Sequence, residues 1–188
     1  MGKTGKLVLA VVLAAVILSG VSLFSTYNRL VGLSEGVDAA WAQVENQLQR
    51  RYDLVPNLVE TVKGYASHER QVFDSIAQAR TQYAGAQSAD ERARAATGLE
   101  SALARLLVIV ENYPNLKADR EFIRLMDELS GTENRIAVER RRFNEVVQEY
   151  NKTIKRIPTR FVAAATGFGT REYFRSSTEA QEAPKVTF

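Results

Sequence analysis

The fold is decided by residues 37–66, which read VDAAWAQVENQLQRRYDLVPNLVETVKGYA. Apolar residues recur along this stretch at spacings of three and four, which places them on one face of a helix. They are Val37, Trp41, Val44, Leu48, Tyr52, Val55, Val59, Val62 and Ala66. Pro56 lies inside the pattern and removes one backbone hydrogen bond, so we expect a bend at that point of the helix.

Three later stretches repeat the same helical spacing. Their apolar faces consist of Val72, Ile76, Ala79 and Tyr83, then Leu99, Leu103, Leu106, Val110 and Tyr113, then Phe122, Leu125, Leu129, Ile136, Phe143, Val147, Tyr150, Ile154 and Ile157. Ser88 and Glu91 have the spacing of a capping box at the start of the third helix, while Pro114 and Pro158 end the third and fourth. The prediction is an all-α fold, an up-and-down four-helix bundle with long first and fourth helices.

Residues 7–27 form an uncharged run, LVLAVVLAAVILSGVSLFSTY, which as a helix would span about 31 Å and cross a bilayer. A cleaved signal peptide is the alternative, but the length of the run and the lack of an A-x-A site favour a retained anchor. Lipidation is excluded because Val21 stands where the modified cysteine would be. We therefore expect an N-terminus (1–6), a transmembrane helix (7–27), a bundle (28–158) and an extended tail (159–188).

Composition argues against several classes of function. The net charge of +3 is spread along the whole chain, so nucleic acid is not an expected partner. There is no cysteine and His68 is the single histidine, which removes thiolate and two-histidine metal sites. A haem held by His68 and Met126 is a remote alternative, since a methionine on a leucine-rich stripe is more often part of a core. We expect no cofactor and no enzymatic activity.

Several motifs together resemble the LemA family. They are Tyr27–Val31 (YNRLV), Gln47–Val59 (QLQRRYDLVPNLV), Glu111–Ala118 (ENYPNLKA), Glu133–Ile136 (ENRI), Arg141–Asn144 (RRFN), Glu149–Asn151 (EYN) and Val186–Phe188 (VTF). The resemblance implies a four-helix bundle behind one membrane span, with no established enzymatic activity. Some relatives take part in forming magnetosome membranes, and others are found alongside membrane metalloproteases, which by analogy suggests two different roles.

The polar residues of these motifs, with the His68 turn and the chain end, are the candidate site residues. They are Arg50, Arg51, Asp53, Pro56, Asn57, His68, Glu69, Glu133, Asn134, Arg135, Asn144, Tyr150, Asn151 and Phe188. One interpretation is a partner-binding surface. The alternative, which we favour, is that they satisfy the carbonyl freed by Pro56 and fix the register of the bundle. His68 and Glu69 would cap or bridge the turn between the first two helices, and Phe188 would pack on the bundle or be captured by a peptide-binding domain.

Helix lengths predict an uncovered apolar surface. The short second and third helices can cover only part of the long pair, and the remainder would expose a candidate oligomer surface. Its residues are Trp41, Val44, Leu48, Phe143, Val147 and Tyr150. We expect both neighbouring copies and the aromatic tail, through Phe161, Phe168 and Phe174, to cover it.

The function expected from these features is a single-pass membrane-anchored scaffold that organises other proteins, or its own assemblies, at a bacterial membrane surface. The alternative is a regulatory partner of an envelope metalloprotease in membrane protein quality control. The expected partners are the lipid bilayer, further copies of the chain, and an envelope protein such as a membrane protease.

The charges that flank the span predict its orientation. Lys3 and Lys6 precede it, whereas Arg29 is the one basic residue among the twenty that follow. The positive-inside rule then places the N-terminus in the cytoplasm and the bundle in the periplasm. Protease added to intact spheroplasts is therefore expected to digest the bundle, and protection until detergent is added would reverse the topology.

Overall fold

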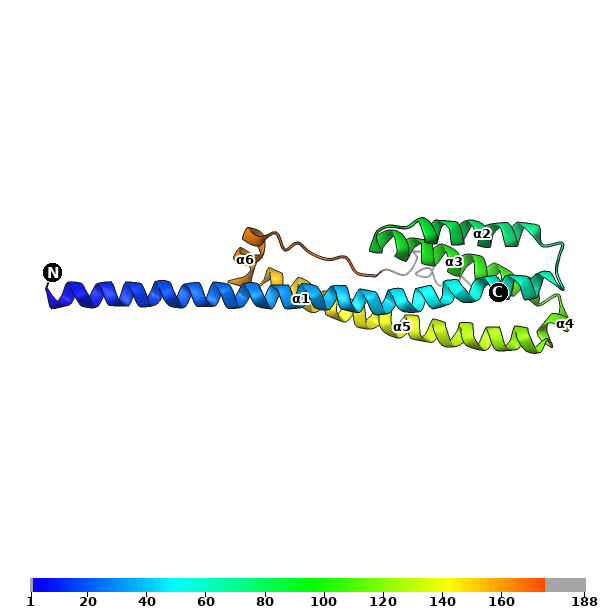
Figure 1. Ribbon diagram of the computed structural model, residues 1–188, viewed down its shortest axis with the longest axis horizontal. Coiled ribbons are helices and arrows are strands. Elements are labelled where there is room, and N and C mark those ends of the chain that lie inside the picture. The colour runs from blue at the N-terminus through cyan, green and yellow to red at the C-terminus, as the bar shows by residue number, and fades with distance from the viewer. Residues whose placement is uncertain (1, 175–188) are drawn as a thin grey trace, which may run out of the picture. The chain divides into compact units, whose positions relative to one another are not determined.

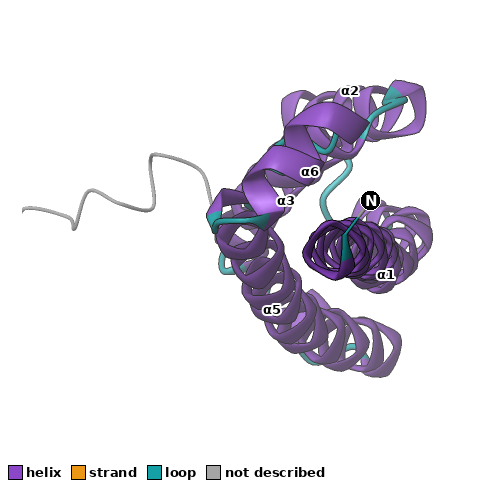
Figure 2. Cartoon of the chain, turned by 90° about the vertical axis from the view of Figure 1, so that its left-hand side faces the viewer, coloured by secondary structure: helices purple, strands orange, loops and turns teal. Residues whose placement is uncertain are grey.

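The computed structural model describes residues 2–174, which contain helices and loops but no strand (Figures 1 and 2). The helices are α1 (Lys3–Lys63), α2 (Arg70–Gly85), α3 (Ala89–Val110), α4 (Pro114–Lys117), α5 (Arg120–Lys155) and α6 (Thr159–Thr166). The prediction of an all-α fold is confirmed over these residues. They divide into two compact units: an anchor unit, 2–40 with 144–173, and a core unit, 41–143 with Phe174.

Helix α1 is a single helix of 61 residues that includes both the predicted span and the predicted first helix of the bundle. The expected boundary near residue 27 is therefore not a break, because no proline separates the two parts. The helix also continues through Pro56. Its N-terminal part holds an 18-residue window of mean hydropathy 2.3 with no buried residue, which supports a membrane span.

One hydrophobic core lies inside the core unit. It draws Val55, Leu58, Val62 and Ala66 from α1 and the turn after it, Phe73, Ile76 and Ala79 from α2, Leu99, Ala102, Leu103, Leu106 and Val110 from α3, Leu116 from α4, and Phe122 and Leu125 from α5. Most of these residues belong to the predicted stripes. Phe73 takes the place that the pattern assigned to Val72, which is only half-buried.

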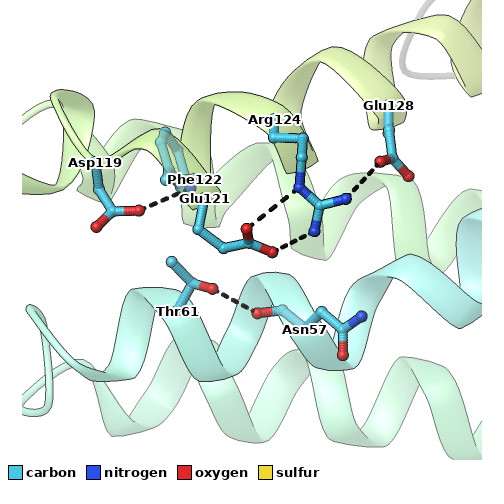
Figure 3. Close-up of polar contacts among 7 residues, drawn as sticks. All are labelled: Asn57, Thr61, Asp119, Glu121, Phe122, Arg124 and Glu128. Carbon is cyan, nitrogen blue, oxygen red and sulfur yellow. Dashed lines mark hydrogen bonds and ion pairs between the residues drawn. The ribbon is translucent and has the colours of Figure 1, made fainter.

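Local side-chain contacts define the starts of two helices in the core unit. At the start of α3, Ser88 accepts from the Glu91 amide at 3.2 Å and the Glu91 carboxylate accepts from the Ser88 amide at 3.2 Å, so the predicted capping box is confirmed. At the start of α5, Asp119 accepts from the Phe122 amide at 2.9 Å (Figure 3). Figure 3 also shows Arg124 between the carboxylates of Glu121 and Glu128. Local geometry thus sets where α3 and α5 begin.

The segment after Pro158 differs from the prediction. Residues 159–166 form helix α6 rather than an extended tail, because Val162 and Ala163 can be buried on one side of it. Gly167 ends the helix in the left-handed conformation (φ 80°), and the Phe168 amide donates to the Ala163 carbonyl at 3.0 Å. Residues 168–174, which follow Gly167, have no helix or strand, in keeping with the expected tail.

Helix α3 offers a matched test of the core. Leu106 is fully buried, whereas Val108, two residues away on the same helix, is 71% exposed. Leu106→Ala should lower the free energy of unfolding by about 2–5 kcal/mol, because it leaves a cavity in the core. Val108→Ala should change it by less than about 0.5 kcal/mol. Urea denaturation in detergent, followed by circular dichroism, measures both, and equal losses would contradict the packing described.

Candidate functional site: a buried arginine layer and a docked C-terminal segment

A buried arginine joins three helices of the core unit. Arg51 of α1 is 1% exposed, and its guanidinium lies 3.6 Å from the Glu100 carboxylate of α3 and pairs with Glu133 of α5. Burial lowers the pKa of Arg51 to about 10, because leaving water disfavours the charged form more than Glu100 favours it. Arg51 is therefore still a cation at neutral pH.

The ion pairs extend from Arg51 towards an aromatic cluster. Glu100 also pairs with Arg140 at 3.4 Å, and the Arg140 guanidinium lies over the Phe174 ring at 4.5 Å. Phe174 stacks on Trp41 with ring centroids 6.1 Å apart, and Trp41 meets Phe143 edge-on at 5.5 Å. The C-terminal segment thus contributes a buried ring to the same layer that holds Arg51. We call this set, Glu133–Arg51–Glu100–Arg140–Phe174, the arginine layer.

A groove opens in the core unit, between α1 and α2. It has a volume of about 480 Å³, with Pro56, Val59 and Phe73 among its apolar lining residues and Lys63 and Asp74 among its charged ones. Such a mixed lining is suited to an apolar side chain carried on a charged protein segment. Pro56 was a predicted site residue, and the structure places it in this wall.

Two tyrosine–carboxylate contacts tie the turns of the core unit together. The Tyr113 hydroxyl donates to Glu69 at 3.1 Å, and the Tyr65 hydroxyl donates to Asp119 at 2.9 Å. These bonds raise the pKa of Tyr65 and, with burial as the larger cause, that of Tyr113. The Glu69 carboxylate makes no cap bond on α2 and instead accepts from Tyr113 in the turn after α3. His68 is exposed in this turn.

In the anchor unit, α5 holds the C-terminal segment by its backbone. The Asn151 side chain donates to the Arg171 carbonyl at 2.8 Å and accepts from the Arg171 amide at 2.9 Å, and the Tyr150 hydroxyl donates to the Gly169 carbonyl at 2.9 Å. The Arg171 guanidinium then reaches Asp38 of α1 at 3.3 Å. Asn151 therefore pairs with a backbone in the way that a neighbouring strand would.

The predicted site residues do not converge on one site. Arg51 and Glu133 meet in the core unit, whereas Tyr150 and Asn151 act in the anchor unit. The exposed members are Arg50, Asp53, Asn57, His68, Asn134 and Arg135, while Asn144 is half-buried and Phe188 lies outside the described residues.

The polar side chains around Pro56 do not make the contact expected of them with the carbonyl of Tyr52. Arg51 turns to its carboxylates, Asp53 accepts from Gln49 at 2.8 Å, and Asn57 is exposed, so these three side chains do not serve the carbonyl of Tyr52. The sequence did not predict Glu100 and Arg171 as site residues, because their partners are distant in the sequence and no local pattern marks them.

The residues of the candidate oligomer surface are mostly buried within the chain itself. Val44, Leu48 and Phe143 are buried within the core unit, and Val147 and Tyr150 within the anchor unit, while Trp41 is half-buried. Two of these residues are in contact with the C-terminal segment of the same chain, since Phe174 stacks on Trp41 and the Gly169 carbonyl accepts from Tyr150. Of the other tail aromatics, Phe168 packs edge-on against Tyr27 and Phe161 stays 65% exposed. Ile157, placed on the same stripe, is also exposed.

The contacts described above are ion pairs, hydrogen bonds and ring contacts. Over residues 2–174, no group of three histidine, aspartate or glutamate side chains is arranged to hold a metal ion. The arginine layer has its cation buried and its carboxylates at the surface, with side-chain exposures of 46% for Glu100 and 44% for Glu133. The groove offers apolar contacts flanked by both signs of charge.

The sequence of the chain matches a known protein family. Residues 40–188 match the model of the LemA family, which covers the whole core unit. The chain is 29% identical to magnetosome protein MamQ 2 of Paramagnetospirillum magneticum, over 88% of this chain and 70% of that protein. It is 28% identical to magnetosome protein MamQ of Magnetospirillum gryphiswaldense, over 97% of this chain and 76% of that protein.

Removing the two carboxylates of the arginine layer should cost more stability than removing the arginine. In Glu100→Ala/Glu133→Ala, the buried guanidinium loses its partners, and such losses typically lower the free energy of unfolding by about 3–5 kcal/mol. In Arg51→Met, water can hydrate the two half-exposed carboxylates, so a loss below about 2 kcal/mol is expected. Urea denaturation compares the two variants, and a greater loss for Arg51→Met would show that the arginine is a net stabilising group.

Proposed function

Because the chain belongs to the LemA family, we propose that it is a single-pass, membrane-anchored scaffold that organises other proteins at a bacterial membrane surface by binding rather than by catalysis. The observation that carries this proposal is that one helix serves both purposes. Helix α1 contains the exposed apolar span and also contributes Pro56 and Val59 to the groove of the core unit. The helix that crosses the membrane therefore also forms part of the proposed binding groove.

The named relatives support a role at a membrane. Both are magnetosome proteins by name, and the chain resembles them through most of its length. We place the N-terminus of this chain in the cytoplasm and its core unit in the periplasm, on the charge asymmetry around the span. Self-association, where it occurs, has to use residues other than the buried Val44, Leu48, Val147 and Tyr150.

The groove can be tested with one substitution and a matched control. Ala77 is exposed and lines the groove on α2, so Ala77→Trp fills the groove without entering the core. Ala104 is exposed on α3, outside the groove, and Ala104→Trp adds the same bulk there. A proximity-labelling enzyme fused to the full chain in living cells should mark a set of envelope proteins. Ala77→Trp should lose most of that set, and Ala104→Trp should keep it.

Other outcomes of this experiment have definite meanings. An unchanged set in Ala77→Trp would show that partners bind elsewhere, and the absence of any enriched envelope protein would contradict a scaffold. A set dominated by one membrane metalloprotease would instead support the alternative role, a regulatory partner of that protease. Equal melting temperatures of the two variants are required, so that loss of partners is not confused with loss of folding.

A further inference from the structure

The junction between α5 and α6 presents an apolar surface to solvent. Ile157 is 75% exposed and Phe161 is 65% exposed. They lie on either side of Pro158, where the Arg160 amide donates to the Arg156 carbonyl at 2.7 Å across the turn between the two helices. Two large apolar side chains are therefore exposed on either side of Pro158, and we call this exposed junction the ridge, while Val162 and Ala163 of α6 are buried.

The same junction is strongly basic. Lys155, Arg156 and Arg160 flank the apolar ridge, and residues 152–171 contain no acidic side chain. Within residues 2–174 these three cations have no carboxylate within ion-pair distance, in contrast to Lys152, which lies 3.9 Å from Glu149. Exposed apolar side chains beside unpaired cations are the composition of a surface that lies on a membrane.

The register of the anchor unit brings this ridge to the end of the membrane span. Helix α5 runs antiparallel to α1 there (Figure 1), and Gly36 lies opposite Val146, since a Cβ added at Gly36 would be 4.0 Å from Val146 Cγ1. Tyr27, the last residue of the uncharged run, and Lys155 each lie nine residues from that contact, or about 14 Å along their helices. Phe168, just after α6, packs on Tyr27 with ring centroids 6.0 Å apart. The junction is therefore level with the place where the span meets the headgroups.

A pocket at the junction could bind an anionic group. It has a volume of about 280 Å³ and lies between the end of α5, helix α6 and the segment after it. Lys155 and Arg160 stand at its rim, and Ala163 and Phe168 line its apolar part. Two cations over an apolar floor suit a lipid headgroup, whose phosphate continues into an apolar chain.

We propose that the junction of α5 and α6 is a second membrane contact, in which Ile157 and Phe161 enter the headgroup region of an anionic bilayer and Lys155, Arg156 and Arg160 bind its phosphates. A second copy of the chain fits less well, because it would bring an equally basic ridge to this one. The contact would hold the anchor unit against the membrane from which its own span emerges. It is independent of the groove, so each can fail without the other.

The chain contains no cysteine, so single labelling sites can be introduced into the full-length protein without other changes. A nitroxide is attached to Phe161→Cys, or to Val108→Cys as a control that is 71% exposed in the core unit. The protein is placed in nanodiscs of phosphatidylethanolamine and phosphatidylglycerol, and collision rates with oxygen and with a water-soluble nickel complex are measured. The ratio of oxygen to nickel collisions should be several-fold higher at position 161 than at position 108.

The charge requirement is tested in the same system. In nanodiscs of phosphatidylcholine alone, the ratio at position 161 should fall, and Lys155→Gln/Arg156→Gln/Arg160→Gln should produce the same fall in anionic nanodiscs. Nickel access at position 161 equal to that at position 108 would overturn the proposal. Spectral broadening at position 161 that disappears on dilution with unlabelled protein would also overturn it, because another copy would then cover the ridge.

Discussion

Helix α1 must be compatible with lipid along one part of its length and with a protein core along another. Both units of the chain contain part of this helix. Its uncharged part satisfies every backbone group within the helix, as a segment in hydrocarbon requires. From Leu30 onward its apolar residues keep to one face, which the returning helices cover. Anchor and core therefore depend on a single change in the pattern of one helix, from apolar all round to apolar on one side.

The features that the sequence predicted well depend on residues close together in the chain. The capping box of Ser88 and Glu91 lies within four consecutive residues, and the stripes on α3 and α5 follow from helical spacing alone. The segment after Pro158 was harder because its glycines and scattered aromatics suggested extended chain, whereas burial of Val162 makes residues 159–166 helical. Burial against a distant element is a tertiary effect, and it overrode the local signal.

The contacts that complete each unit join residues far apart in the sequence. Asn151 was selected for its motif, but its partner Arg171 is 20 residues away and bonds through its backbone, which no side-chain pattern can reveal. Glu100 lacks a motif and is recognisable only once Arg51 is seen to be buried beside it. A buried guanidinium accepts few arrangements of its neighbours, so this layer is suited to selecting one register of three helices over alternatives that hydrophobic packing alone would tolerate.

The segment that ends at Phe174 has a consequence for biosynthesis. Residues 169–174 are translated after all six described helices, yet they hold Tyr150 and Trp41 in place. While the ribosome is still making them, α1 is already available for membrane insertion, but the ring of Trp41 lacks its stacking partner and Asn151 lacks the backbone to which it bonds. During that interval the nascent chain exposes more of the Trp41 ring than the finished protein does, and a chaperone that recognises aromatic surface would have its best opportunity then.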